Sequence, residues 1–413
     1  MNILFILPNL PWPMTAGGNQ AMFNGIKAVK DRASVHVVYF EYYNRYNEAA
    51  KKEMEEKLGN VTVTPYIYNH RKGAYKFYYW FIDQLAQIFK IIRNKDFQSD
   101  LMPQAYKVRP HEYIDFVNKY IVKNKIDIVQ VEMIPDLSLI LSLPENVKRI
   151  FVHHELRYVF NEQKFQQLGM TSYRYANLKL AKIQEIGLLN LYDSVVTLSS
   201  IDKEKLSSAG VKGRIDTSFA VVSTPANVLA FKGDGHLLSF VGPSKQLPNS
   251  VGVKWFLENC WEKLLSIDSN YHLRIVGNWR EDQKKELQNK YANLEFTGFV
   301  KDLSEVVKET IMIVPLTIGS GIRMKILEAA SMGIPVVTTT VGVEGIPMVN
   351  EKHCLIEDTP DGFINAIIKL KQADTRADII NSANQIIKEN YSLEALADNR
   401  MAIYSAVLSK HEI

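Results

Sequence analysis

The sequence predicts an α/β protein with two domains, each built from parallel strands that alternate with helices. Short apolar runs rich in β-branched residues recur along the chain, with helix-forming segments between them. Near the middle of the chain, residues 224–227 and 231–236 have the composition of a linker. We therefore expect a first domain over residues 1–225, a linker over 226–236 and a second domain over 237–390.

The composition is that of a globular protein without a disulfide framework. The chain has 413 residues, of which 46% are hydrophobic and 23% charged, with a formal net charge of +4. Cys260 and Cys354 lie far apart and lack the spacing of a metal or disulfide motif. Residues 2–7 lack the basic region of a signal peptide, and no apolar run reaches the ~18 residues of a transmembrane helix. We expect a cytoplasmic protein, and no nucleic-acid motif is present.

The N-terminal segment is predicted to form a βαβ unit. Residues 2–7 and 35–40 are expected strands, and a helix is expected from about Gln20 to Lys30. Gly17 and Gly18 precede this expected helix. The pair is not the G-x-G-x-x-G dinucleotide fingerprint, so no NAD site follows, and a plain tight turn accounts for an isolated glycine pair.

Residues 70–95 combine aromatic and basic side chains at helical spacing, with Asp83 as the opposing charge. The apolar positions are Phe77, Trp80, Phe81, Leu85, Ile88, Phe89 and Ile92. A basic, aromatic helix of this kind is typical of a membrane-surface element, which would bring the chain to lipid-linked acceptors. The alternative is a core-facing helix of the first domain with a solvated basic side.

Polar and titratable residues follow a further expected strand of the first domain. After expected strands at 126–131 and 149–152, the chain continues with His153, His154 and Glu155. Residues directly after parallel strands lie at the edge of the sheet where open α/β sheets bind ligands. The alternative is a local polar cluster that caps the following helix.

The second domain is expected to begin with a strand at 237–241. Its first loop, residues 242–249, contains Gly242 and Lys245 and precedes a helix. Two further strand-to-loop transitions place Gly277 after one strand and Phe299 with Val300 after another. From sequence alone these are ordinary loops between strands and helices.

The most informative stretch is a second βαβ unit over residues 314–346. A strand at 311–316 is followed by Gly319, Ser320 and Gly321, and a helix is expected over 322–332, with Ser320 as its N-cap. Gly333 stands where a left-handed C-cap belongs, and Pro335 stops the helix.

This loop has the composition of an anion site. A helix N-terminus offers unpaired N–H groups and a partial positive charge. Arg323 and Lys325 add two cations where acidic residues are usually preferred, so a bound diphosphate would compensate the charge. The alternative is that both side chains are solvated, with Lys325 paired to Glu328.

The stretch from Pro315 onward, P-x-x-x-G-S-G-I-R-M-K-I-L-E-A-A-S-M-G-I-P-V-V-T-T, resembles the donor-site signature of the retaining glycosyltransferase family GT4. The resemblance implies the GT-B fold, in which two Rossmann-like domains with parallel sheets face a central cleft. It also implies that a C-terminal helix, here residues 391–413, returns to the first domain. Where the family usually has a second glutamate, this chain has Ser320, a departure found in part of the family.

The resemblance also assigns roles to individual residues. The glutamate matching Glu328 binds the donor ribose, while Lys245, Arg323 and Lys325 would hold the diphosphate. One of His153 and His154 would contact the donor sugar or its phosphate, and we favour His154 slightly. The remaining expected donor contacts are Gly17, Gly18, Gly242, Gly277, Phe299, Val300, Gly319, Ser320 and Gly321.

The implied activity is metal-independent transfer of a hexosyl group from a UDP- or GDP-sugar to a glycan or lipid-linked acceptor, with retention. No D-x-D pair is evident near the donor loops, so no metal and no further cofactor is expected. Surface polysaccharide or lipopolysaccharide synthesis is the family's commonest setting. The alternatives are a GT-B nucleotide-sugar epimerase and a non-catalytic binding module, the second suggested by Ser320.

Overall fold

The computed structural model describes residues 1–14, 16–69, 107–222, 229, 231–300 and 302–409. Its contacts divide the chain into two compact units. The first comprises Met1–Thr197, Lys203–Ser218 and Asn399–Ile413, and the second comprises Leu198–Asp202 and Phe219–Asp398. Residues 70–95, for which a basic aromatic helix is expected, lie outside the described residues.

The first unit contains a parallel sheet in the order β3-β2-β1-β4-β5-β6-β7. The strands are β1 (Asn2–Leu7), β2 (Ser34–Tyr42), β3 (Thr62–Tyr68), β4 (Ile128–Glu132), β5 (Lys148–His153), β6 (Ser194–Thr197) and β7 (Arg214–Thr217). The helices are α1 (Gly17–Val29), α2 (Glu48–Leu58), α5 (His111–Lys123), the 3-10 helix η1 (Ile134–Leu141), α6 (Arg157–Gln167), α7 (Ser172–Leu189) and α8 (Ser200–Ala209). Residues 3–7 of β1 are fully buried, because parallel strands are covered on both faces.

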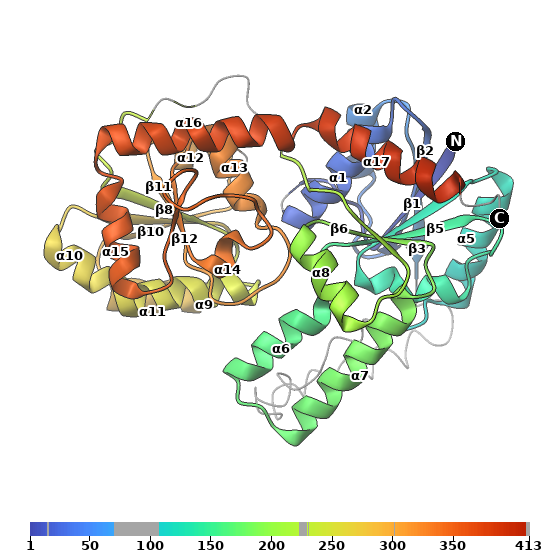
Figure 1. Ribbon diagram of the computed structural model, residues 1–413, viewed down its shortest axis with the longest axis horizontal. Coiled ribbons are helices and arrows are strands. Elements are labelled where there is room, and N and C mark those ends of the chain that lie inside the picture. The colour runs from blue at the N-terminus through green and yellow to red at the C-terminus, as the bar shows by residue number, and fades with distance from the viewer. Residues whose placement is uncertain (15, 70–106, 223–228, 230, 301, 410–413) are drawn as a thin grey trace. The chain divides into compact units, whose positions relative to one another are not determined.

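The second unit repeats the architecture with a sheet in the order β10-β9-β8-β11-β12-β13. The strands are β8 (Leu237–Val241), β9 (His272–Val276), β10 (Leu294–Gly298), β11 (Ile311–Val314), β12 (Val336–Thr338) and β13 (Leu355–Ile356). The helices are α9 (Leu247–Phe256), the π-helix η2 (Leu257–Trp261), α10 (Glu262–Ile267), α11 (Glu281–Lys290), α12 (Leu303–Val307), α13 (Met324–Met332), α14 (Thr340–Val343), α15 (Pro360–Lys369) and α16 (Ala373–Asn390). In Figure 1, α9 and α11 lie on one side of this sheet, and α13 and α16 on the other.

The predicted α/β class, with two Rossmann-like parallel-sheet domains, is therefore confirmed. The last helix, α17 (Leu393–Leu408), is divided between the units, with residues 399–408 in the first. There the Tyr404 hydroxyl donates to Gln130 Oε1 on β4 at 2.6 Å. No helix of the described segments is long and apolar enough to cross a bilayer.

Two local predictions were wrong at helix starts. Gly17 and Gly18 form the first turn of α1, which follows an Ala16 N-cap, instead of preceding the helix. Glycine is tolerated there because its entropic cost is greatest in the interior of a helix. Ser320 is not the N-cap of α13, because the helix begins later and Arg323 occupies that position. Gly333 is in the left-handed conformation at φ 78°, ψ 30°, which confirms the predicted C-cap.

Candidate functional site

Glycines at the carboxyl ends of three neighbouring strands bring the loops of the second unit into backbone contact. Gly277 N donates to Gly298 O at 2.8 Å, and Gly242 N donates to Val276 O at 2.8 Å. A Cβ on Gly277 would lie 2.9 Å from the carbonyl carbon of Gly242, and Gly277 has a φ of 127°. Only glycine fits both the dihedral angle and the space. The edge of the sheet is thus closely packed at Gly242 and Gly277, where there is no room for a side chain.

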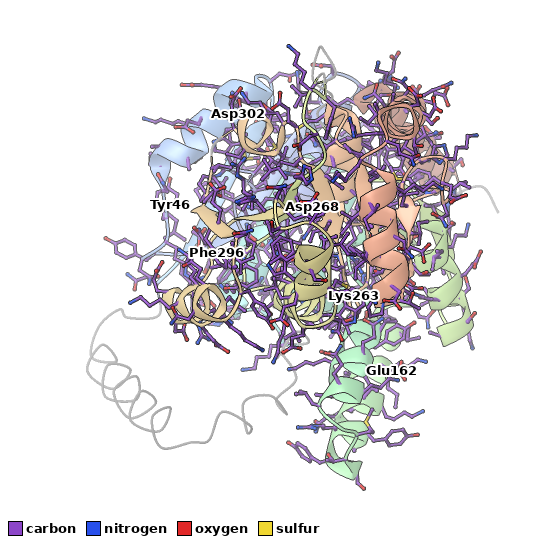
Figure 2. The ribbon with its side chains drawn as sticks, turned by 90° about the vertical axis from the view of Figure 1, so that its left-hand side faces the viewer. Tyr46, Glu162, Lys263, Asp268, Phe296 and Asp302 are labelled. Atoms are coloured by element: carbon purple, nitrogen blue, oxygen red, sulfur yellow. The ribbon has the colours of Figure 1, made fainter. Side chains whose placement is uncertain are left out.

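Trp279 fixes the position of the loop after β8. Its indole Nε1 donates to Gly242 O at 2.9 Å, and the side chain is almost fully buried. Its ring packs against Phe296 on β10 with 5.7 Å between centroids, and Phe296 is labelled in Figure 2. Trp279 could not be predicted as a site residue, because an aromatic residue after a strand gives no signal of its hydrogen-bond partner.

Asn249 connects the loop after β8 to α13. The side chain is buried, and its Nδ2 donates to Pro243 O at 3.0 Å and to Gln246 Oε1 at 3.1 Å. Its Oδ1 accepts from Lys325 Nζ at 2.8 Å. Asn249 therefore shapes the loop and positions the Lys325 ammonium. An asparagine just after Pro248 resembles an ordinary turn residue, which is why sequence reasoning missed it.

Lys325 is a cation held in poorly solvated surroundings. Its Nζ lies 4.3 Å from the centre of the Phe240 ring on β8. The pKa of Lys325 falls to about 7, chiefly because burial removes the ammonium from water and in part because of the nearby Arg323 guanidinium, while Glu328 acts in the opposite direction. An anion beside it would favour the charged form. This arrangement agrees better with an anion site than with the alternative of a solvated lysine.

Arg323 organises the loop that precedes α13. Its Nη1 donates to Ser320 O at 2.6 Å and also to Gly321 O. Gly319 lies against the same guanidinium, since a Cβ there would be 2.7 Å from Arg323 Nη2. Arg323 and Ser320 are both buried, and Gly319 and Gly321 have φ values of 131° and 78°. The structure thus brings these four predicted residues together, with the arginine contacting the loop itself.

The other predicted donor residues of this unit lie on the surrounding elements. Glu328 is half-buried on α13, one turn after Lys325. Lys245 is exposed in the loop after β8. In the loop after β10, Phe299 is 53% exposed and Val300 is half-buried.

The two histidines of the first unit have different environments. His153 is the last residue of β5, and its Nε2 is 2.8 Å from Glu185 Oε1, with both side chains fully buried. The same carboxylate accepts from Arg157 N at 3.2 Å and Tyr158 N at 3.0 Å, so it also caps the start of α6. These bonds give His153 a structural role inside the unit. They agree with the alternative that the polar residues after β5 cap the following helix.

His154 is bonded to the carboxylate at the end of the neighbouring strand. Its Nε2 contacts Glu132 Oε2, and its side chain keeps 10% exposure. The other oxygen, Glu132 Oε1, accepts from Gln130 Nε2 at 2.5 Å, and Gln130 Oε1 accepts from Tyr404 on α17. Sequence reasoning missed this buried chain because its members lie far apart along the sequence. With Nε2 engaged by Glu132, Nδ1 is the ring nitrogen that remains to meet a ligand.

Gly18 lies at the same edge of the first sheet. A Cβ there would overlap Met133 Cε, and Met133 directly follows Glu132. Met133 has a φ of 67°, an uncommon value for a residue with a side chain. Such backbone strain is often found at functional sites. Within the first unit, the glycine pair and His154 therefore lie around the carboxyl end of β4.

Among the described residues, no group of three or more His, Cys, Asp or Glu side chains is arranged to hold a metal ion. Both cysteines are buried, and burial raises the pKa of each thiol to about 12. They are therefore inert at neutral pH.

Comparison with known proteins gives one family match, which lies in the second unit. Residues 235–373 match the model of the family described as Glycosyl transferases group 1. A curated relative, Glycosyltransferase 1 domain-containing protein 1 of Xenopus tropicalis, is 21% identical over 323 residues. The aligned region covers 76% of this chain and 83% of the relative.

Solved structures resemble the chain over almost its whole length. A TarM variant of S. aureus in complex with Fondaparinux, alpha-GlcNAc-glycerol and UDP has a TM-score of 0.68 at 13% identity, covering 98% of this chain and 100% of its own. HepE of Anabaena in complex with UDP has a TM-score of 0.66 at 14% identity, with coverage of 98% and 100%. The solved structures confirm the predicted GT-B fold. The family match and the curated relative confirm the predicted resemblance to glycosyltransferases and support glycosyl transfer as the activity.

Proposed function

We propose that this chain, with its GT-B fold and its glycosyl transferases group 1 domain, transfers a hexosyl group from a nucleotide-diphosphate sugar to a glycan or lipid-linked acceptor with retention of anomeric configuration. UDP- or GDP-sugars are the proposed donors. Surface polysaccharide or lipopolysaccharide synthesis is the proposed setting, in the cytoplasm or at the inner face of the plasma membrane.

The observation that carries the proposal is the coupling between Lys325 and the loop after β8. Lys325 Nζ is bonded to Asn249 Oδ1 at 2.8 Å, in surroundings that lower the lysine pKa to about 7. Unfavourable burial of a cation at a helix N-terminus is understandable if the site binds an anion there. The glycines at 242, 277 and 319 let Asn249, the Gly242 backbone and Arg323 pack closely at the same sheet edge, which shapes the loops around Lys325.

We assign the donor contacts on this basis. The diphosphate lies at the N-terminus of α13, where Lys325 and Lys245 are the charged contacts and Arg323 keeps the loop in shape. Glu328 holds the ribose hydroxyls, and the loop carrying Phe299 and Val300 holds the base. In the first unit His154, and not the internally bonded His153, contacts the donor sugar or its phosphate.

The proposed transfer requires that the negative charge developing on the departing β-phosphate be stabilised. Backbone N–H groups at the start of α13 and the Lys325 ammonium are preorganised donors for that charge. Removing one such donor typically costs about 2.7–4 kcal/mol of transition-state stabilisation. The acceptor hydroxyl gives its proton to the leaving phosphate, so no side chain is required as a base. Because the charge is met by cations and N–H groups, we propose that activity persists in EDTA.

Thermal unfolding with a panel of nucleotides tests the donor site. UDP, GDP, ADP, dTDP and CMP are added separately to the purified chain. A ligand at about a hundred times its Kd stabilises by roughly 2.7 kcal/mol, which a melting curve resolves. A shift with one diphosphate that is lost in Glu328→Ala supports the site, whereas an unchanged shift in that variant rejects the role of Glu328.

A non-catalytic sugar-nucleotide binding module is the second candidate. Ser320 stands where the family usually has a glutamate near the sugar ring, and it is buried in the loop. Donor binding without sugar transfer and without slow donor hydrolysis would favour this candidate. Release of UDP or GDP from a matching sugar donor would favour the enzyme, and interconversion of sugars without an acceptor would instead indicate an epimerase.

A further inference from the structure

Strand β4 carries two polar residues in the interior of the first unit. Gln130 and Glu132 are 0% and 2% exposed, and β4 is a central strand between β1 and β5. Central parallel strands are normally apolar along their length, because both of their faces are covered. Burying an amide and a carboxylate costs free energy unless each is hydrogen-bonded. The two residues therefore indicate a hydrogen-bonding role that an apolar pair would not supply.

A chain of hydrogen bonds joins these residues to helix α17 and to His154. Residues two apart on a strand lie on the same face, so Gln130 and Glu132 share one side of β4. There Tyr404 Oη donates to Gln130 Oε1 at 2.6 Å, and Gln130 Nε2 donates to Glu132 Oε1 at 2.5 Å. The other oxygen of the carboxylate, Glu132 Oε2, is bonded to His154 Nε2. We call Tyr404, Gln130 and Glu132 the β4 polar chain.

The first two bonds of the β4 polar chain have a defined direction. Burial raises the pKa of the Tyr404 phenol above its ordinary value, although the nearby Arg400 guanidinium acts in the opposite direction. The phenol therefore keeps its hydrogen at neutral pH and acts as a donor. Because the Gln130 carbonyl accepts this hydrogen bond, the amide turns its N–H group toward Glu132.

The last bond sets the position of the hydrogen on the His154 ring. An ionised carboxylate only accepts hydrogen bonds, so Glu132 in this form requires a hydrogen on His154 Nε2. The bond from Gln130 stabilises the ionised form. A neutral ring with its hydrogen on Nε2 presents Nδ1 as an acceptor. Loss of the bond from Gln130 favours a protonated Glu132, which donates to Nε2 and moves the ring hydrogen to Nδ1.

We propose that Tyr404 and Gln130 are positioning residues that hold His154, through Glu132, in the tautomer with its hydrogen on Nε2. The tautomer is a property of the first unit itself, whereas its effect on transfer rests on the proposed function. With Nδ1 as an acceptor, the neutral ring fits a hydroxyl group of the donor, since a phosphate oxygen would need an N–H group in its place.

The alternative is that the β4 polar chain only attaches α17 to the sheet. The bond between Tyr404 and Gln130 would be sufficient for that purpose. The chain instead continues through Glu132 to His154, whose side chain keeps 10% exposure at the carboxyl end of the sheet. A buried series of bonds that ends on a partly exposed ring is better explained by a role in orienting that ring.

Nitrogen-15 NMR of the full chain, labelled on its histidine ring nitrogens, tests the tautomer directly. The shifts of the two nitrogens identify which one carries the hydrogen. We expect it on Nε2 of His154 in the unmodified chain, with the signals assigned by their absence in His154→Ala. Tyr404→Phe and Gln130→Met should each move the signals toward the other tautomer. The control Tyr192→Phe removes a buried bond to Leu137 O of 2.9 Å in the same unit and should leave them unchanged.

A sugar-transfer assay adds a second readout that a purely structural role would not change. Tyr404→Phe should lower kcat/KM about tenfold, near the upper range for one lost hydrogen bond. Tyr192→Phe also loses one buried bond, so its melting temperature should fall similarly, but its kcat/KM should stay unchanged. The double variant Tyr404→Phe with Gln130→Met should be no slower than Gln130→Met alone, because both changes interrupt the same chain.

Three outcomes would overturn the proposal. The first is a hydrogen on Nδ1 of His154 in the unmodified chain, and the second is unchanged His154 signals in Tyr404→Phe and Gln130→Met. The third is an equal loss of kcat/KM in Tyr404→Phe and Tyr192→Phe, which would reduce the β4 polar chain to the attachment of α17. The NMR measurement needs neither donor nor acceptor. Absence of transfer by the unmodified chain would therefore contradict the proposed function and not the tautomer.

Discussion

Replacing Lys325 by methionine should make the protein without bound nucleotide more stable at low pH. The same change should weaken binding of the nucleoside diphosphate. Methionine keeps an apolar stem beside Phe240 and removes the ammonium that burial disfavours. The ordinary pKa of the lysine is 10.5, and in the folded protein it is about 7. Between these values the folded state binds fewer protons than the unfolded chain, so the free energy of unfolding rises with pH in this window.

The size of the effect follows from the folded pKa. At pH 6 Lys325 is charged in both states, and at pH 8 it is mostly neutral in the folded state. Between pH 6 and pH 8, the free energy of unfolding of the unmodified chain should therefore rise by about 1.3 kcal/mol relative to that of Lys325→Met. For a unit of this size, that corresponds to a change of roughly 3–5 °C in the difference between the two melting temperatures. Other titrating groups cancel because they are common to both proteins.

Thermal unfolding at pH 6 and pH 8, without nucleotide, measures this difference. Lys254→Met on α9 is the matched control, since that lysine is 70% exposed and its replacement should change little at either pH. The reasoning is refuted if the difference between Lys325→Met and the unmodified chain is the same at both pH values. A methionine variant that is less stable at both pH values would assign the ammonium a structural role.

Further predictions concern the loops and the two histidines. Gly277→Ala should lower the free energy of unfolding of the second unit by about 2 kcal/mol or more in denaturant unfolding. The new Cβ would lie 2.9 Å from the Gly242 carbonyl carbon, and alanine would have to adopt the φ of 127° that Gly277 has. The control is Gly25→Ala in α1, where a Cβ would have no atom within 4 Å. This change should stabilise the protein slightly. His153→Ala should cost about 3 kcal/mol or more, since Glu185 would remain buried without its ring partner. His154→Ala should cost less stability, because Gln130 still donates to Glu132, and should mainly lower kcat in a sugar-transfer assay; a larger loss of stability than in His153→Ala would contradict this.

The alternation of strands and helices was predictable because buried parallel strands and glycine-capped helices leave local signals. The βαβ unit around residues 311–338 was recognised from its apolar run, its glycines and the stop at Gly333. The start of α13 was missed because a serine before a helix is a common cap, while here an arginine bonded to the loop carbonyls occupies that position.

Contacts between distant residues could not be predicted from sequence. Asn249 and Lys325 are separated by 76 residues, and Glu132 and His154 by 22, so no local pattern connects them. The choice between His153 and His154 also depended on tertiary structure, because the adjacent residues bond to carboxylates on different elements, one on α7 and one on β4.

Calorimetric titration of UDP and GDP into the unmodified chain and into Lys325→Met tests the central claim most directly. We predict that one nucleoside diphosphate binds, that binding at pH 8 takes up a proton as the lysine becomes charged, and that affinity falls in the methionine variant. The proton uptake is read from the dependence of the heat on the ionisation enthalpy of the buffer. Equal affinity and equal proton uptake in both proteins would place the diphosphate away from α13 and contradict the account.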